Sequence, residues 1–277
     1  MNKKIKTLVF ISSLAFGQQA LAAACSAEPI TGIDDCWTVP DTYTITLYEM
    51  GVCNDIRDQV ATVPDLSSKC QTAYTNTTGS TVAVENNVTG ELSGGTTTRP
   101  AENTYAYGFI KVDAQLILKN KSTFEAARDG SAGGVGTTCW TNGVALGAGA
   151  TTTCGNAVDA NPQNMDVFII NLDCAGGPQN SFYCRYEGDA EGLDDTYAWL
   201  VDVNGNASTN RNYSDAAGDV KYLIGIAKFN ESKIVNTAST GMQAQFSVTR
   251  GLLLDFADNT IAFGLQEFKV VTTITTD

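Results

Sequence analysis

The 277-residue sequence contains 30 acidic residues, 17 basic residues and no histidine, for a formal net charge of −13 at pH 7. A surface this negative repels phosphate backbones, so the composition excludes a typical nucleic-acid-binding protein. The lack of histidine excludes the usual Ser-His-Asp and Cys-His nucleophile systems and removes the commonest transition-metal ligand.

Residues 1–22 have the three-part layout of a secretory signal peptide. The start is basic, an apolar run follows from Leu8 to Phe16, and Ala20 and Ala22 place small side chains at the −3 and −1 positions of a cleavage site. The run is too short to cross about 30 Å of hydrocarbon. We therefore expect bacterial Sec-type export to the extracellular space or cell surface, with no membrane span. The alternative is a buried N-terminal strand or helix.

Cleavage after Ala22 leaves residues 23–41 as an N-terminal arm ahead of a body that covers residues 42–277. Cys25 in this arm is either a lipid anchor or a disulfide partner. A lipoprotein signal needs a large aliphatic residue three places before the cysteine, and Ala22 stands there. We expect a disulfide at Cys25, and a free arm that is a second candidate for contact between subunits.

From residue 41 onward, apolar and polar residues alternate with the period of two that is typical of strands. In DTYTITLYEM (41–50), Tyr43, Ile45 and Leu47 alternate with threonines. Asn142-Gly143 and Asn204-Gly205 are hairpin signals. Only two short pieces resemble helices, 52–61 and 122–130. Further strands are expected at 80–88, 104–119, 139–146, 165–173, 181–186, 196–203, 221–229, 241–250, 251–256, 259–265 and 267–276.

About a dozen strands at regular spacing predict an all-β fold, an antiparallel β-sandwich of the jelly-roll or Ig-like type. The Gly- and Ser-rich stretch near 130–138 is either a boundary between two small domains or a long loop within one large domain.

The sequence contains an even number of cysteines, which in an exported chain indicates a disulfide framework. Their spacing suggests four local pairs, 25 with 36, 53 with 70, 139 with 154 and 174 with 184, although eight cysteines allow 105 arrangements. Zinc is the competing interpretation, but the chain has no histidine and no C-x-x-C. The predicted disulfide cysteines are Cys25, Cys36, Cys53, Cys70, Cys139, Cys154, Cys174 and Cys184.

The run EGDAEGLDD (187–195) is the densest acidic segment. Carboxylates on a glycine-containing loop suit Ca²⁺, so calcium is the one cofactor we consider; a solvated acidic loop is the alternative. Asp202, Asn204 and Asn206 have the spacing of half a calcium loop, but the rest of that motif is absent. The candidate ligands are Glu187, Asp189, Glu191, Asp194 and Asp195.

Four aromatic residues, Tyr105, Tyr107, Phe109 and Trp199, are candidates for a sugar-binding platform or for the core. A paired-carboxylate glycosidase stays open as an enzyme class because acids are plentiful. No catalytic set stands out, and we predict that the chain is not an enzyme.

The blocks TYTITLYEMGVC (42–53), TRPAENTYAYGFIKVDA (98–114) and GTTCWT (136–141), together with Cys70, resemble uncharacterised β-rich structural proteins of marine bacteria and phages. The resemblance covers roughly residues 42 to 141. It implies a structural role, as a virion or particle component, and carries no catalytic residues. The predicted export signal departs from that pattern, because ordinary tailed-phage virion proteins assemble in the cytoplasm.

Together, these features predict a secreted structural subunit whose partner is itself. It would self-assemble by β-strand complementation into a filament, pilus-like fibre or surface layer. The candidate assembly strand is EFKVVTTITT (267–276), with Phe268, Val270, Thr272 and Ile274 alternating along it. The alternatives are a carbohydrate-binding or adhesin-like β-sandwich that binds a cell-surface glycan, with or without calcium, and a virion-associated structural protein.

Overall fold

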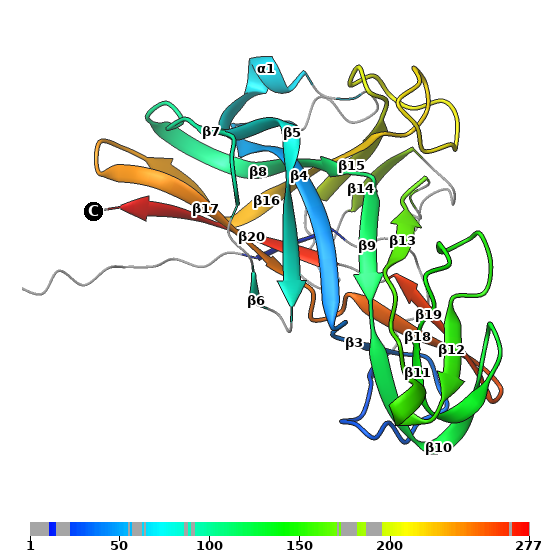
Figure 1. The fold of residues 1–277 in the computed structure, drawn as a ribbon. Helices are drawn as coiled ribbons and strands as arrows, with labels where there is room; N and C mark the ends of the chain where they lie inside the picture. Colours follow the sequence, from blue (N-terminus) through cyan, green and yellow to red (C-terminus); the bar gives the residue numbers. More distant parts are fainter. Residues whose placement is uncertain are drawn as a thin grey trace, which may run out of the picture.

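The computed structural model is nearly all-β, which confirms the predicted fold class (Figure 1). A ten-stranded and a seven-stranded sheet, both mostly antiparallel, pack together, and a third, three-stranded sheet contacts the ten-stranded one. The described helices are α1 (Leu66–Lys69) and the 3-10 turn η2 (Ala157–Asp159), and neither is long enough to cross a membrane. The structure describes residues 11–14, 23–54, 56, 63, 65–85, 88–89, 92–170, 172, 182–186, 196–265 and 268–276.

The ten-stranded sheet is built on one long bent strand, formed by β8 (Asn103–Asp113) and β9 (Gln115–Lys119). β4 (Thr42–Cys53) pairs with both halves along one side. On the other side, β16 (Tyr222–Val235) pairs with β8, and β13 (Met165–Phe168) pairs with β9. The remaining strands are β5 (Cys70–Glu85), β6 (Val88–Thr89), β7 (Thr96–Thr97), β14 (Tyr183–Tyr186) and β15 (Thr196–Val201).

The seven-stranded sheet collects three distant parts of the chain, at the lower right of Figure 1. β3, from the N-terminal part, pairs antiparallel with β18, which comes from near the C-terminus. β10, from the middle, pairs parallel with β19. The strands are β2 (Ala23–Ala24), β3 (Cys36–Thr38), β10 (Lys121–Gly130), β11 (Val135–Thr141), β12 (Thr152–Gly155), β18 (Leu252–Ala257) and β19 (Thr260–Leu265).

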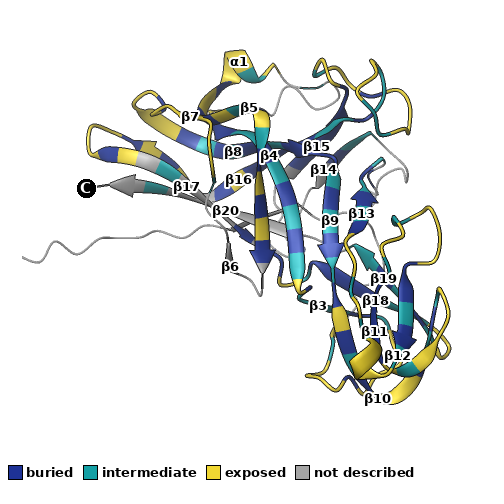
Figure 2. Cartoon of the chain, viewed as in Figure 1, coloured by how far each residue is buried: buried dark blue, intermediate teal, exposed yellow. Residues whose placement is uncertain are grey.

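One continuous core lies between the two large sheets. On β4, Tyr43, Ile45 and Leu47 are fully buried while the threonines between them are half-buried, as the period of two predicts. They belong to the same apolar cluster as Leu252 and Phe263 from the seven-stranded sheet. Figure 2 shows the alternation of buried and more exposed positions along β4 and β5.

Two local predictions are wrong. Residues 122–130, which resemble a helix in sequence, lie in β10, because pairing with β11 and β19 overrides the helix preference of Glu125, Ala126 and Ala127. Asn142-Gly143 forms a bend after β11 and not a hairpin turn, whereas the turn at Asn204-Gly205 returns the chain from Val201 to an antiparallel bridge at Ala207, as predicted.

The Gly- and Ser-rich stretch 130–138 holds the turn between β10 and β11. Gly133 and Gly134 both have positive φ, and a side chain at Gly134 would meet the backbone carbonyl of Cys154. The strands on either side of this turn belong to the same seven-stranded sheet.

Three of the four predicted cysteine pairs are present: Cys25–Cys36, Cys53–Cys70 and Cys139–Cys154. The second and third join residues that lie directly opposite each other on paired strands. Cys184 is also disulfide-bonded, and its expected partner Cys174 lies outside the described residues. Several disulfides in one chain indicate an oxidising environment, typically extracellular.

Residues 23–41 are not the free arm that the sequence suggested. Ile30 is 2% exposed, and its backbone N–H and carbonyl both bond to β10. The Asp35 carboxylate accepts a hydrogen bond from the N–H of Phe256, 2.8 Å away. Burial of the apolar Ile30 side chain stabilises this position of the arm, because exposing that side chain to water would cost free energy.

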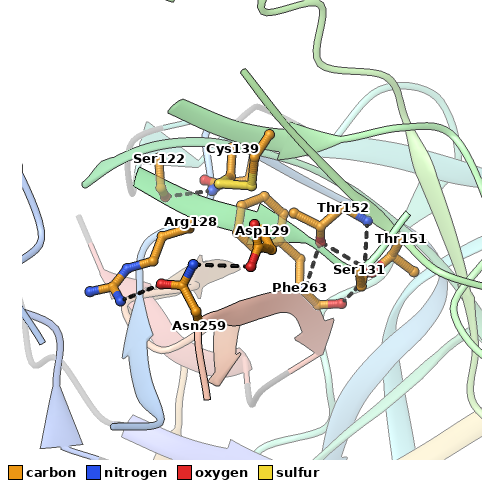
Figure 3. The surroundings of a disulfide bond; sticks show 11 residues. Ser122, Arg128, Asp129, Ser131, Cys139, Thr151, Thr152, Asn259 and Phe263 are labelled. Carbon is orange, nitrogen blue, oxygen red and sulfur yellow. Dashed lines mark hydrogen bonds between the residues drawn. A yellow bond between two sulfur atoms is a disulfide. The ribbon is translucent and has the colours of Figure 1, made fainter. Parts of the chain in front are cut away.

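Buried Arg128 fastens this arm to the sheet. Its Nη2 donates to the carbonyl of Gly32 at 2.9 Å, and its Nη1 donates to Oδ1 of Asn259 at 3.2 Å. The guanidinium also lies over the rings of Phe256 and Phe124, 5.5 Å and 6.0 Å from their centroids. Figure 3 shows Arg128, Asn259 and Asp129 linked in a row beside the disulfide of Cys139.

We expect Arg128→Met to lower the free energy of unfolding by about 2–3 kcal/mol, because it leaves the Gly32 carbonyl without its donor. Arg99→Met is the matched control: Arg99 is 40% exposed and pairs with Glu102, so the loss should stay below about 1 kcal/mol. Urea unfolding followed by tryptophan fluorescence measures both. Equal losses in the two variants would contradict the role assigned to Arg128.

Peptide mapping under non-reducing conditions should recover the three described disulfides and a fourth, Cys174–Cys184. The reason is that Cys184 is bonded, and Cys174 is the cysteine that the pairwise spacing leaves for it. A free thiol at Cys174 in the purified protein, or a linkage from it to another cysteine, would contradict this expectation.

Candidate assembly site

The predicted assembly strand is present as β20 (Phe268–Thr276), the last strand of the chain. It pairs antiparallel with β17 (Ser239–Ser247), from Ser247 opposite Lys269 to Ser239 opposite Thr276. One edge of β20 is therefore filled along nearly its whole length. In Figure 1, β20 runs beside β17 and ends at the C-terminus, away from the seven-stranded sheet.

The other edge of β20 is only partly filled. A short strand, β1 (Ile11–Leu14), pairs antiparallel with it, with Ile11 opposite Val271 and Leu14 opposite Phe268. Beyond Val271, β20 has no described partner on this side. We call the three strands β1, β20 and β17 the C-terminal sheet.

The four candidate assembly residues divide between these two regions. Phe268 and Val270 lie where β20 has a neighbour on both sides. Thr272 and Ile274 lie where β17 is the only strand partner described. Half the predicted interface is thus an open backbone edge, and the other half is covered by a strand that comes from the predicted signal peptide.

A small apolar cluster attaches the C-terminal sheet to the ten-stranded sheet. It contains Val52, Tyr105, Phe229 and Val235, and Met242 and Ile274 from the C-terminal sheet pack against it. Met242 and Ile274 also lie directly opposite each other on β17 and β20. These contacts fix one face of the C-terminal sheet while leaving its edges to backbone pairing.

Buried Lys233, on β16, lies next to this cluster. It is 5% exposed, and its Nζ stands 5.4 Å from the centroid of the Phe229 ring. Burial disfavours the charged ammonium and lowers the pKa of Lys233 to about 8, although the nearby Glu231 carboxylate acts in the opposite direction. The sequence gives no sign of this, because Lys233 lies in the polar segment NESK, where a solvent-facing lysine is the ordinary expectation.

The candidate aromatic platform is not available to a ligand in the structure. Tyr105, Tyr107, Phe109 and Trp199 are each at most 3% exposed. Tyr107, Phe109 and Trp199 belong to an apolar cluster against which Leu66 of α1 packs, whereas Tyr105 belongs to the cluster under the C-terminal sheet. All four are core residues, the alternative that the sequence left open.

Asp202, the first residue of the partial calcium motif, organises a loop. Its carboxylate accepts hydrogen bonds from the N–H groups of Asn204, Asn206 and Gly218 at 2.9, 2.9 and 3.0 Å. Burial works against the charged form, but these bonds outweigh it and hold the pKa of Asp202 below its ordinary value. Both carboxylate oxygens are thereby engaged by the backbone.

The five candidate calcium ligands, Glu187, Asp189, Glu191, Asp194 and Asp195, lie outside the described residues. Within the described ranges, no group of three or more His, Cys, Asp or Glu side chains could hold a metal ion. The calcium site therefore stays a prediction from the sequence.

A polar network that the sequence did not reveal lies where β4, β8 and β16 meet. Asp113 accepts hydrogen bonds from the hydroxyls of Tyr213 at 2.7 Å and Tyr48 at 3.2 Å, and Lys221 lies 3.4 Å from its carboxylate. Burial, with Asp113 nearby, raises the pKa of Tyr48 to about 12. These contacts tie the loop that precedes β16 to β4 and β8.

Comparison with known proteins found no protein-family model, curated protein or solved structure that matches the chain. The resemblance noted from the sequence blocks is not supported by any such match.

Because the pKa of Lys233 is about 8 in the folded chain and 10.5 in an ordinary lysine, the unfolded chain binds more protons between these values. We expect stability to rise as the pH increases through this window. Lys233→Met should remove that rise, because no titratable ammonium is left at this position. Thermal unfolding from pH 7 to 10.5 measures the effect, with Lys111→Met as the control, since the Lys111 side chain is 20% exposed and pairs with Glu49. The same slope in Lys233→Met and the unaltered chain would contradict the prediction.

Proposed function

We propose that the chain is an exported structural subunit that self-assembles by β-strand complementation through β20, into a filament, pilus-like fibre or surface layer. The observation that supports this most directly is the incomplete edge of β20, which is paired with β1 only at Phe268–Val271. If residues 1–22 are removed as a signal peptide, the nine-residue strand keeps β17 as its only described partner. An open strand edge of this length is a template for a strand from another chain.

The C-terminal sheet would then have two different outer edges, one on β20 and one on β17, which has no second strand partner among the described residues. Pairing of β20 in one copy with β17 in the next is heterologous. Repeated from copy to copy, it need not close, and an open polymer follows.

The direction of β1 supports this pairing. Both β1 and β17 run antiparallel to β20, so they run in the same direction as each other. The edge of β20 thus already accepts a strand that runs as an incoming β17 would. Every β20 in the polymer would then point the same way, which is the requirement for a regular head-to-tail repeat.

The purified chain of residues 23–277 should form filaments visible by negative-stain electron microscopy. Thr273→Lys with Thr275→Lys places two charges on the open part of β20. We expect this variant to reduce sedimentable protein at least about tenfold, because lysines on an open strand edge oppose pairing with another chain.

Thr75→Lys with Thr77→Lys is the matched control, because both threonines are exposed on β5, away from β20. It should assemble like the unaltered chain. Deletion of residues 267–277 should abolish assembly, with circular dichroism used to verify that the body stays folded. A mature chain that stays monomeric by analytical ultracentrifugation at all concentrations would overturn the proposal.

A further inference from the structure

The strand on the edge of β20 comes from a segment that the sequence predicts to be temporary. β1 belongs to the predicted leader, residues 1–22, and the described body begins at Ala23. β1 also approaches β16 and β15, so it lies against the ten-stranded sheet as well as along β20. The leader therefore fills part of the acceptor edge in the full-length chain.

One strand edge can hold only one partner at a time. Each backbone N–H and C=O on that side of Phe268–Val271 can be used either by β1 or by a strand of another copy. The two pairings are mutually exclusive, whatever side chains the incoming strand carries.

We infer that β1 is a removable placeholder: it occupies the acceptor edge of β20 while the leader is attached, and β17 of a second copy takes its place after the leader is cut. The inference rests on the proposed function and adds the step that controls it. It gives the leader a role in holding the subunit unassembled, besides the export that its composition predicts.

The lengths of the competing strands favour exchange after cleavage. β1 pairs over four residues, whereas β17 has nine residues and β20 offers nine, Phe268–Thr276. While it is tethered, β1 is present at an effective concentration of about millimolar, which compensates for its short length. Cleavage removes the tether, and a four-residue ladder cannot then compete with a longer one.

The placeholder also answers a physical problem of such subunits. An unpaired edge promotes premature association, and natural proteins cover or disrupt such edges. Here the covering strand and the segment to be removed are the same, so removal and exposure happen in one step.

The test uses the oxidised full-length chain with a specific-protease sequence inserted between Ala22 and Ala23. The uncut chain should be monomeric by sedimentation. After cutting, it should form filaments at concentrations at least about tenfold below the highest concentration at which the uncut chain stays monomeric. Circular dichroism and thermal unfolding of both samples establish that the body stays folded.

A disulfide lock separates cleavage from release of the strand. Ser13→Cys with Lys269→Cys joins directly opposite residues of β1 and β20. The native pairs Cys53–Cys70 and Cys139–Cys154 join directly opposite residues in the same way. The locked chain should stay monomeric after cutting. Ser13→Ala with Lys269→Ala, which changes the same positions without a bond, should assemble once cut.

The outcomes distinguish the two proposals. Equal assembly of the uncut and cut chains, or assembly of the locked and cut chain, overturns the placeholder while leaving self-assembly in place. No assembly in any form, with a folded body, overturns the proposed function and the placeholder with it.

Peptide competition provides a second test. A synthetic peptide of residues 8–17 should bind the cut, leader-free chain and suppress filament formation, whereas a scrambled peptide should do neither. Equal behaviour of the two peptides counts against the placeholder.

Discussion

Antiparallel pairing between β3 and β18 brings the beginning and the end of the body into one sheet, and the position of the candidate assembly strand β20 depends on it. The pairing sets Cys36 opposite Leu254 and Thr38 opposite Leu252. Contacts this distant in sequence are costly in chain entropy, and they are supported here by Ile30, Arg128 and the Cys25–Cys36 disulfide. Once β18 and β19 are fixed, β20 follows within a few residues and is directed back along β17.

Charge limits how the copies can meet. A chain with net charge −13 repels its own copies, so association needs a local attraction that does not depend on opposite charges. Backbone hydrogen bonding along a strand edge is such an attraction, and the eleven residues 266–276 contain one acid, Glu267, and one base, Lys269. Salt that screens the remaining repulsion would favour association. The acidic surface and the nearly uncharged last strand are therefore complementary features of one subunit.

The sequence predicted the strands well because their signal is local. Apolar and polar residues alternate in β4 and in the long bent strand of β8 and β9 because one face of each is buried. The cysteine pairs are close in sequence, and Cys53 and Cys70 lie opposite each other on neighbouring strands. β10 was missed because its helix-forming residues Glu125, Ala126 and Ala127 yield to partners far away in the chain. The sequence indicated the last strand as a candidate for assembly. It could not indicate that this strand pairs with Ile11–Leu14, since the register between distant strands leaves no local pattern. For the same reason, the sequence did not reveal that Lys233 is buried.

The adjacency of β17 and β20 has a mechanical consequence. In a fibre built on these strands, tension would enter each subunit through one of them and leave through the other, and the two lie side by side in one ladder. The load would act as shear along a row of hydrogen bonds, the direction in which many bonds resist together. The ten-stranded body and its Cys53–Cys70 bridge would lie off this path, hanging from the fibre axis as an unstretched side group free to present its loops to the surroundings.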